Sequence, residues 1–229
     1  MSSKKYKYYT YELDMVFLNV LAIILMVLLI GVLLLMRLHL NMIVHPVILI
    51  VSTVLWLCLH EVLHGIGFAI FPEVNKGNIT FGIKLEKCVF YCMCKQKISR
   101  RVILTSLMFP FTFIGVVTLI LGIILENYLL IFLSVINISG AVGDLVMFYY
   151  FLKVPKDIIY LDLDDCTSFT VLSDKDLSSI RVGGIRLKES SFYDEKKMFP
   201  RDKRRLVISK TSYIVLGILL ILSILEGLV

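Results

Sequence analysis

Five runs of apolar residues dominate this chain of 229 residues, and each is long enough to cross a lipid bilayer as a helix. In lipid, every backbone polar group must find its hydrogen-bond partner within the chain, so such runs fold as helices. The composition agrees, because 58% of the residues are hydrophobic and soluble globular domains contain roughly 45–50%. The sequence therefore predicts a mainly α, polytopic membrane helix bundle. Its helices are expected at about 13–36, 43–71, 101–125, 128–152 and 211–228.

The basic residues lie almost entirely on one side of these spans. Three lysines precede the first span, seven basic residues follow the second up to and including Arg101 at the start of the third, and thirteen separate the fourth from the fifth. By the positive-inside rule, the N-terminus and the 73–100 and 153–210 segments are predicted to be cytoplasmic, and the C-terminus extracytoplasmic. Tyr8, Tyr9 and Tyr11 suit an aromatic belt at the membrane interface. The net charge of +6 thus reflects orientation in a cell membrane and attraction to the lipid bilayer, and no nucleic-acid partner is expected.

The polar stretch after the second span, residues 73–100, is expected to form a β-hairpin. Its two β-prone runs are Ile79–Leu85 and Cys88–Met93, separated by a charged pair. The cysteines here follow a C-x3-C-x-C spacing, which does not match the paired C-x2-C pattern of zinc ribbons. They are therefore interpreted as small apolar strand residues.

The longest polar stretch, residues 156–210, is expected to form a small cytoplasmic α+β segment. Apolar and polar residues alternate over 159–164, as in a strand, and Ser173 followed by Asp176 predicts a short helix start. About 50 residues of this composition are too few for an independent enzyme. The predicted organisation is a membrane domain over 1–155, this segment, and a C-terminal span within 211–229.

The second apolar run contains the pentad His60-Glu61-Val62-Leu63-His64. On a helix, positions i and i+4 lie one above the other, so both imidazoles project from one face and can bind the same metal ion. Glu61 would stand beside that metal, where it can take a proton from a bound water. Ionisable side chains are costly in lipid, and those inside spans tend to be functional. The pattern predicts a catalytic zinc site, with a packed histidine pair or a structural metal as alternatives.

A catalytic zinc ion usually takes three protein ligands and leaves a fourth position open for water. Asp144 lies about two-thirds of the way through the fourth span, and His60 about two-thirds of the way through the second. Both spans run in the same direction, so the two side chains are expected at one depth. Ser139 and Gly143 form a small-xxx-small pair, which permits close approach between membrane helices. Asp144 is therefore the predicted third ligand, with a structural hydrogen-bonding role as the alternative.

The pentad, together with Asn137-x-Ser139-Gly140-x-x-Gly143-Asp144 in a later span, resembles the bacterial family of membrane zincin peptidases. More distantly, the chain is similar to the site-2 proteases, which are zinc intramembrane metalloproteases, although it lacks the proline of their Asn-Pro-Asp-Gly motif. The resemblance covers residues 43–155. It implies a Zn²⁺-dependent peptidase acting on a membrane-embedded or membrane-adjacent peptide. In such enzymes a β-hairpin near the metal can pair with an extended substrate, a role that residues 79–93 would fill here.

Under this interpretation, His60, His64 and Asp144 hold Zn²⁺. Glu61 is the general base on the zinc-bound water, and Asn137 is a further catalytic candidate that could hydrogen-bond the oxyanion or the substrate backbone. Two other classes compete. A di-iron lipid desaturase would need many histidines, and the four present argue against it. A non-catalytic metal-binding membrane protein, such as an accessory or immunity factor, would have no need of a carboxylate at position 61.

Overall fold

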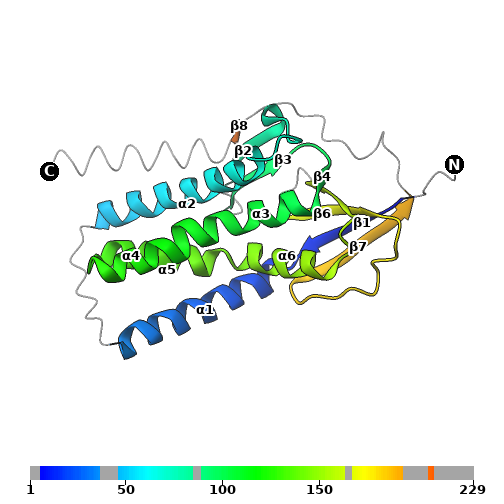
Figure 1. Ribbon diagram of the computed structural model, residues 1–229. Helices are drawn as coiled ribbons and strands as arrows, with labels where there is room; N and C mark the ends of the chain where they lie inside the picture. Colours follow the sequence, from blue (N-terminus) through cyan, green and yellow to red (C-terminus); the bar gives the residue numbers. More distant parts are fainter. Residues whose placement is uncertain (1–5, 37–45, 85–88, 163–166, 193–205, 209–229) are drawn as a thin grey trace.

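The computed structural model describes residues 6–36, 46–84, 89–162, 167–192 and 206–208 (Figure 1). Long helices run side by side, and the strands gather near one end of them (Figure 1). The helices are α1 (Met15–Leu35), α2 (Pro46–Ala69), α3 (Arg100–Pro110), α4 (Thr118–Ile124), α5 (Tyr128–Gly140) and α6 (Val142–Lys153). A π-helical segment, η3 (Phe111–Val117), joins α3 to α4, and a short 3-10 helix, η1 (Lys76–Asn78), follows α2.

Three helical rods are long and apolar enough to cross a membrane: α1, α2 and the rod Arg100–Ile124 made of α3, η3 and α4. The pair α5 and α6 would be a fourth, but the two helices meet at a bend of 46°. The single helix expected over 128–152 is therefore broken at Ala141, whose N–H bonds the Asn137 carbonyl and closes α5. The fifth span, expected at 211–228, lies outside the described residues.

The helix starts use residues that suit those positions. Asp14 precedes α1, and its carboxylate accepts a hydrogen bond from the Phe17 N–H at 3.1 Å. Pro46 occupies the first position of α2, where its missing N–H costs nothing. Asn127 precedes α5 in the same way, and its side chain accepts from the Leu130 N–H at 3.0 Å.

One sheet of five strands has the order β4-β5-β6-β1-β7. Its strands are β1 (Lys7–Leu13), β4 (Ile98–Ser99), β5 (Ile159–Asp162), β6 (Ser168–Ser173) and β7 (Ile185–Phe192). β1 lies between β6 and β7 and pairs antiparallel with both, with Thr10 opposite Thr170. The segment 156–210, predicted as a small α+β segment, contributes β5, β6, β7 and β8. Strands β5, β6 and β7 share the five-stranded sheet with the N-terminal strand and with β4, which precedes α3.

The helix expected near Ser173 is wrong, because the described residues 156–162 and 167–192 form strands and turns only. The Ser173 hydroxyl accepts from the Lys175 N–H at 3.0 Å, and Asp176 accepts from the Ser178 N–H at 3.0 Å. Both side chains therefore close local turns rather than begin a helix, which is the usual competition for serine and aspartate.

An aromatic core joins this sheet to α6. Tyr9 and Tyr11 of β1 are 1% and 2% exposed, so they belong to the core and not to an interfacial belt. The Tyr11 ring centroid lies 4.9 Å from that of Tyr150 in α6 and 5.5 Å from that of Phe169 in β6. The five-stranded sheet is thus fixed to the helix that carries Asp144.

A second sheet of three strands, in the order β3-β2-β8, lies beside α2 (Figure 1). Its strands are β2 (Ile79–Lys84), β3 (Val89–Cys94) and β8 (Leu206–Ile208). β2 and β3 pair antiparallel with Phe81 opposite Cys92, and they occupy the two runs for which a hairpin was predicted. A Cβ on Gly65 would lie 2.6 Å from the Phe81 ring, so this glycine lets β2 approach α2 one residue after His64.

Candidate metal centre

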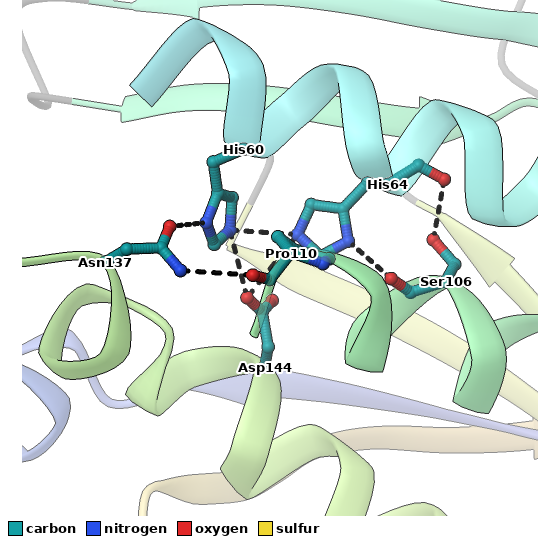
Figure 2. Close-up of polar contacts among 6 residues, drawn as sticks. All are labelled: His60, His64, Ser106, Pro110, Asn137 and Asp144. Carbon is teal, nitrogen blue, oxygen red and sulfur yellow. Dashed lines mark hydrogen bonds and ion pairs between the residues drawn. The ribbon is translucent and has the colours of Figure 1, made fainter. Parts of the chain in front are cut away.

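The two histidines of α2 point from one face of the helix toward α5 and α6 (Figure 2). Their Nε2 atoms are 3.1 Å apart. Asp144, in the first turn of α6, places Oδ2 at 3.1 Å from Nε2 of His60 and 3.4 Å from Nε2 of His64. The structure thus brings the three predicted ligand atoms together from two helices that are far apart in sequence.

The other ring nitrogen of each histidine is engaged by a partner that can only accept. Nδ1–H of His60 donates to Oδ1 of Asn137 at 2.8 Å. Nδ1–H of His64 donates to the backbone carbonyl of Ser106 at 2.9 Å. With the proton on Nδ1, each neutral imidazole presents a lone pair at Nε2. Two lone pairs and a carboxylate oxygen therefore face one another, an arrangement that requires a cation or an added proton between them.

The spacing of the three ligand atoms suits zinc. Zinc binds histidine nitrogen and carboxylate oxygen at roughly 2.0–2.2 Å in tetrahedral geometry, which sets the ligand atoms about 3.3 Å apart. The observed separations are 3.1, 3.1 and 3.4 Å. The hydrogen bonds at Nδ1 are also the ones that typically orient metal-binding histidines.

Glu61 lies beside the three ligand atoms. Its carboxylate and the histidine nitrogens all lie within 4.8 Å of one another. Among the described residues, Asp144 is the acid that forms ion pairs with both imidazoles. Glu61 therefore lies beside the three ligand side chains rather than among them. Its carboxylate faces the backbone amide of Cys92 in β3. This acid therefore stands between the metal ligands and the edge of the hairpin.

A cavity of about 240 Å³ opens over these residues. Its walls come from α2, α3 and α6 on one side and from β3, β5 and β6 on the other. Gly140 and Gly143 line it; a Cβ on Gly140 would meet nothing within 4 Å, and one on Gly143 only Leu18 at 4.0 Å. Gly143 therefore makes no tight helix contact of the kind expected for the Ser139–Gly143 pair, and it leaves room beside Asp144.

Ser106 was not among the residues predicted from the sequence, and Asn137 was predicted as a catalytic candidate rather than as a hydrogen-bond partner of His60. Ser106 carries the carbonyl that holds His64, and the signal for it was Pro110, which lacks the N–H that would bond the carbonyl four residues earlier. Asn137 lies behind His60: its Oδ1 accepts from His60, and its Nδ2 donates to the Pro110 carbonyl at 3.2 Å (Figure 2). Both polar atoms of that side chain therefore contact the protein itself.

Comparison with known proteins gave one result. A family model described as "Putative zincin peptidase" matches residues 53–159, a stretch that contains both histidines, Glu61 and Asp144. No match was found among curated proteins or among solved structures. The family match and the group His60, Glu61 and His64 together indicate a zinc metallopeptidase.

Proposed function

We propose that this protein is a zinc-dependent intramembrane metalloprotease that hydrolyses a peptide bond in or next to a membrane segment. The observation that carries the proposal is the convergence of Nε2 of His60, Nε2 of His64 and Oδ2 of Asp144 within 3.4 Å. This convergence occurs among helices apolar enough to span a bilayer. Bound Zn²⁺ would polarise the scissile carbonyl and lower the pKa of a coordinated water towards ~7.

The remaining chemistry falls to residues of the chain. His60, His64 and Asp144 serve as metal ligands, and the second nitrogen of each histidine stays protonated by its bond to Asn137 or Ser106. The Glu61 carboxylate takes the proton from the attacking water and returns it to the leaving amine. We assign Asn137 to positioning His60 rather than to contacting substrate, because both of its polar atoms already have protein partners.

The edge of β3 offers a place for the substrate. The Lys95 N–H bonds the Asn78 carbonyl on the β2 side, so by strand alternation Phe90, Cys92 and Cys94 turn their backbone groups away from β2. The Cys94 N–H already donates to Asp162 at 2.8 Å. The Cys92 amide faces Glu61, so the backbone groups of Phe90 and the carbonyl of Cys92 are the places at which an extended peptide would add as a strand, beside Glu61. This arrangement would parallel the proposed similarity to site-2 proteases.

We further propose a multi-pass cell-membrane protein with a cytoplasmic N-terminus and an extracytoplasmic C-terminus. The support is that β1, the hairpin and strands β5 to β7 gather near one end of the helices (Figure 1). These strands belong to the N-terminal, 73–100 and 153–210 segments, which together carry 22 of the 24 basic residues. The metal site lies toward the same end, so water would reach it from the cytoplasm. Its substrate would be a membrane-embedded or membrane-adjacent peptide.

The test is a Glu61→Gln variant of the full chain, with Glu73→Gln as the control. Glu73 lies in the exposed turn after α2, so its substitution changes the same charge away from the site. Zinc content is measured on both purified proteins, and new peptide N-termini are labelled in membranes from cells expressing each variant or the unchanged protein. We expect Glu61→Gln to keep zinc and to lose N-termini that the other two produce. Identical sets of N-termini in all three would overturn the peptidase assignment.

A further inference from the structure

We propose that Pro110, where the rod Arg100–Ile124 passes from α-helix to π-helix, positions both metal-binding histidines through two backbone carbonyls of that rod, those of Ser106 and Pro110. The inference rests on the metal site of the proposed function and not on the identity of the reaction. In Figure 2 the Ser106 carbonyl faces Nδ1 of His64, on the side of that ring away from its metal-facing nitrogen, and the Pro110 carbonyl faces the Asn137 amide. Pro110 is therefore a positioning residue: it acts on His64 through the Ser106 carbonyl, and on His60 through its own carbonyl and Asn137.

The first carbonyl belongs to Ser106 and is available because of proline chemistry. In an α-helix the N–H of residue 110 would bond the carbonyl of residue 106, and proline has no N–H. Nδ1–H of His64 takes that place at 2.9 Å. In return, the Ser106 hydroxyl donates to the His64 carbonyl at 3.0 Å. Ser106 is 0% exposed, so no water replaces either partner without opening the interface.

The second carbonyl belongs to Pro110 and acts through Asn137. The chain beyond Pro110 winds as the π-helix Phe111–Val117, a form often found at functional sites. Within it, a Cβ on Gly115 would lie 3.2 Å from Nδ2 of Asn137, so the glycine makes room for the amide. Nδ2 of Asn137 donates to the Pro110 carbonyl at 3.2 Å, while its Oδ1 accepts from His60 at 2.8 Å. Asn137 is 3% exposed, which makes this relay a buried one.

The two branches have one chemical result. Each histidine meets a pure acceptor at Nδ1, which keeps the proton there and leaves the Nε2 lone pair for the metal. Replacing Pro110 by alanine would restore an N–H that competes with His64 for the Ser106 carbonyl. It would also favour α-helical winding over the π segment that brings the Pro110 carbonyl to Asn137.

The experiment compares Pro110→Ala, Asn137→Ala and Ser134→Ala in the purified full-length protein. The Ser134 hydroxyl is buried in α5 and hydrogen-bonds across to Thr118 at 2.7 Å without touching a histidine, so its loss is a matched structural change. Zinc affinity is measured by competition with a chelating dye, and the visible absorption of the Co²⁺-substituted protein reports ligand geometry. We expect zinc binding to weaken roughly 10–100-fold in the first two variants, with a shifted Co²⁺ spectrum. Ser134→Ala should match the unchanged protein.

Several results would overturn the inference. Wild-type zinc affinity and Co²⁺ spectra in both Pro110→Ala and Asn137→Ala would do so, as would an equal loss of affinity in Ser134→Ala. If Pro110→Ala does not fold, Asn137→Ala still decides, because it removes the His60 branch alone. A wild-type protein that binds no zinc would refute the metal site itself, and with it the proposed function.

Discussion

Replacing Gly67 with alanine tests how closely α2 and α3 must pack for the metal site to form. A Cβ on Gly67 would lie 2.6 Å from the Ser106 Cα and 3.3 Å from its N. Non-bonded carbon atoms approach to about 3.5–4.0 Å, so the helices would have to separate by about 1 Å. The obstructing atom belongs to the backbone and cannot rotate away.

That separation acts directly on the hydrogen bond that orients His64. The bond from Nδ1–H of His64 to the Ser106 carbonyl would lengthen from 2.9 Å to about 3.9 Å, beyond hydrogen-bonding range. We expect zinc affinity to fall about 10-fold or more. Overpacking of this kind should also reduce the free energy of unfolding by about 1–3 kcal/mol.

The assay is zinc competition together with thermal unfolding of the purified protein. Gly31→Ala is the control, because a Cβ on Gly31 in the interior of α1 meets nothing within 4 Å. This control should keep its zinc affinity and gain up to about 1 kcal/mol from helix propensity. A Gly67→Ala protein with unchanged zinc affinity and an unchanged melting temperature would refute the packing argument.

Three other predictions concern the fold. A cysteine introduced at Glu126 should be labelled by a membrane-impermeant maleimide in intact cells, whereas one introduced at Lys188 should be labelled only after permeabilisation. Labelling is measured relative to the unsubstituted protein, and the reverse pattern would contradict the proposed orientation. Tyr11→Ala should lower stability by about 3–5 kcal/mol, measured by thermal unfolding, because its ring is 2% exposed and packs on α6. Burial raises the pKa of Cys94 to about 12, so the thiol stays protonated at pH 8. Iodoacetamide should therefore modify Cys94 only after denaturation. Rapid modification of Cys94 in the folded protein would show that this thiol is accessible.

The sequence predicted that His60, His64 and Asp144 would lie close together, because the signals for this are local or geometric. The spacing of His60 and His64 fixes their shared helix face, and the span boundaries set Asp144 at a similar depth. The structure brings those three side chains within 3.4 Å. Periodicity could not reveal the bend at Ala141, since the residues on both sides of it are mostly apolar.

The place of β1 was not predictable from its own residues. The run Lys7–Leu13 is rich in tyrosine and has a threonine at its centre, which favours a strand, but it was interpreted as an interfacial belt. Its partners β6 and β7 lie about 160–180 residues later, and pairing at that distance depends on the whole fold. The roles of Ser106 and Asn137 were hidden for the same reason, because each depends on which helix lies opposite.

The most direct test of the account is X-ray absorption at the zinc edge on the purified full-length protein and its Asp144→Asn variant. The account predicts one zinc per chain with two imidazole nitrogens and oxygen ligands, all at about 2.0–2.2 Å, and an altered or lost oxygen shell in the variant. A sulfur shell near ~2.3 Å, or a spectrum that Asp144→Asn leaves unchanged, would contradict the convergence of these three side chains on a metal.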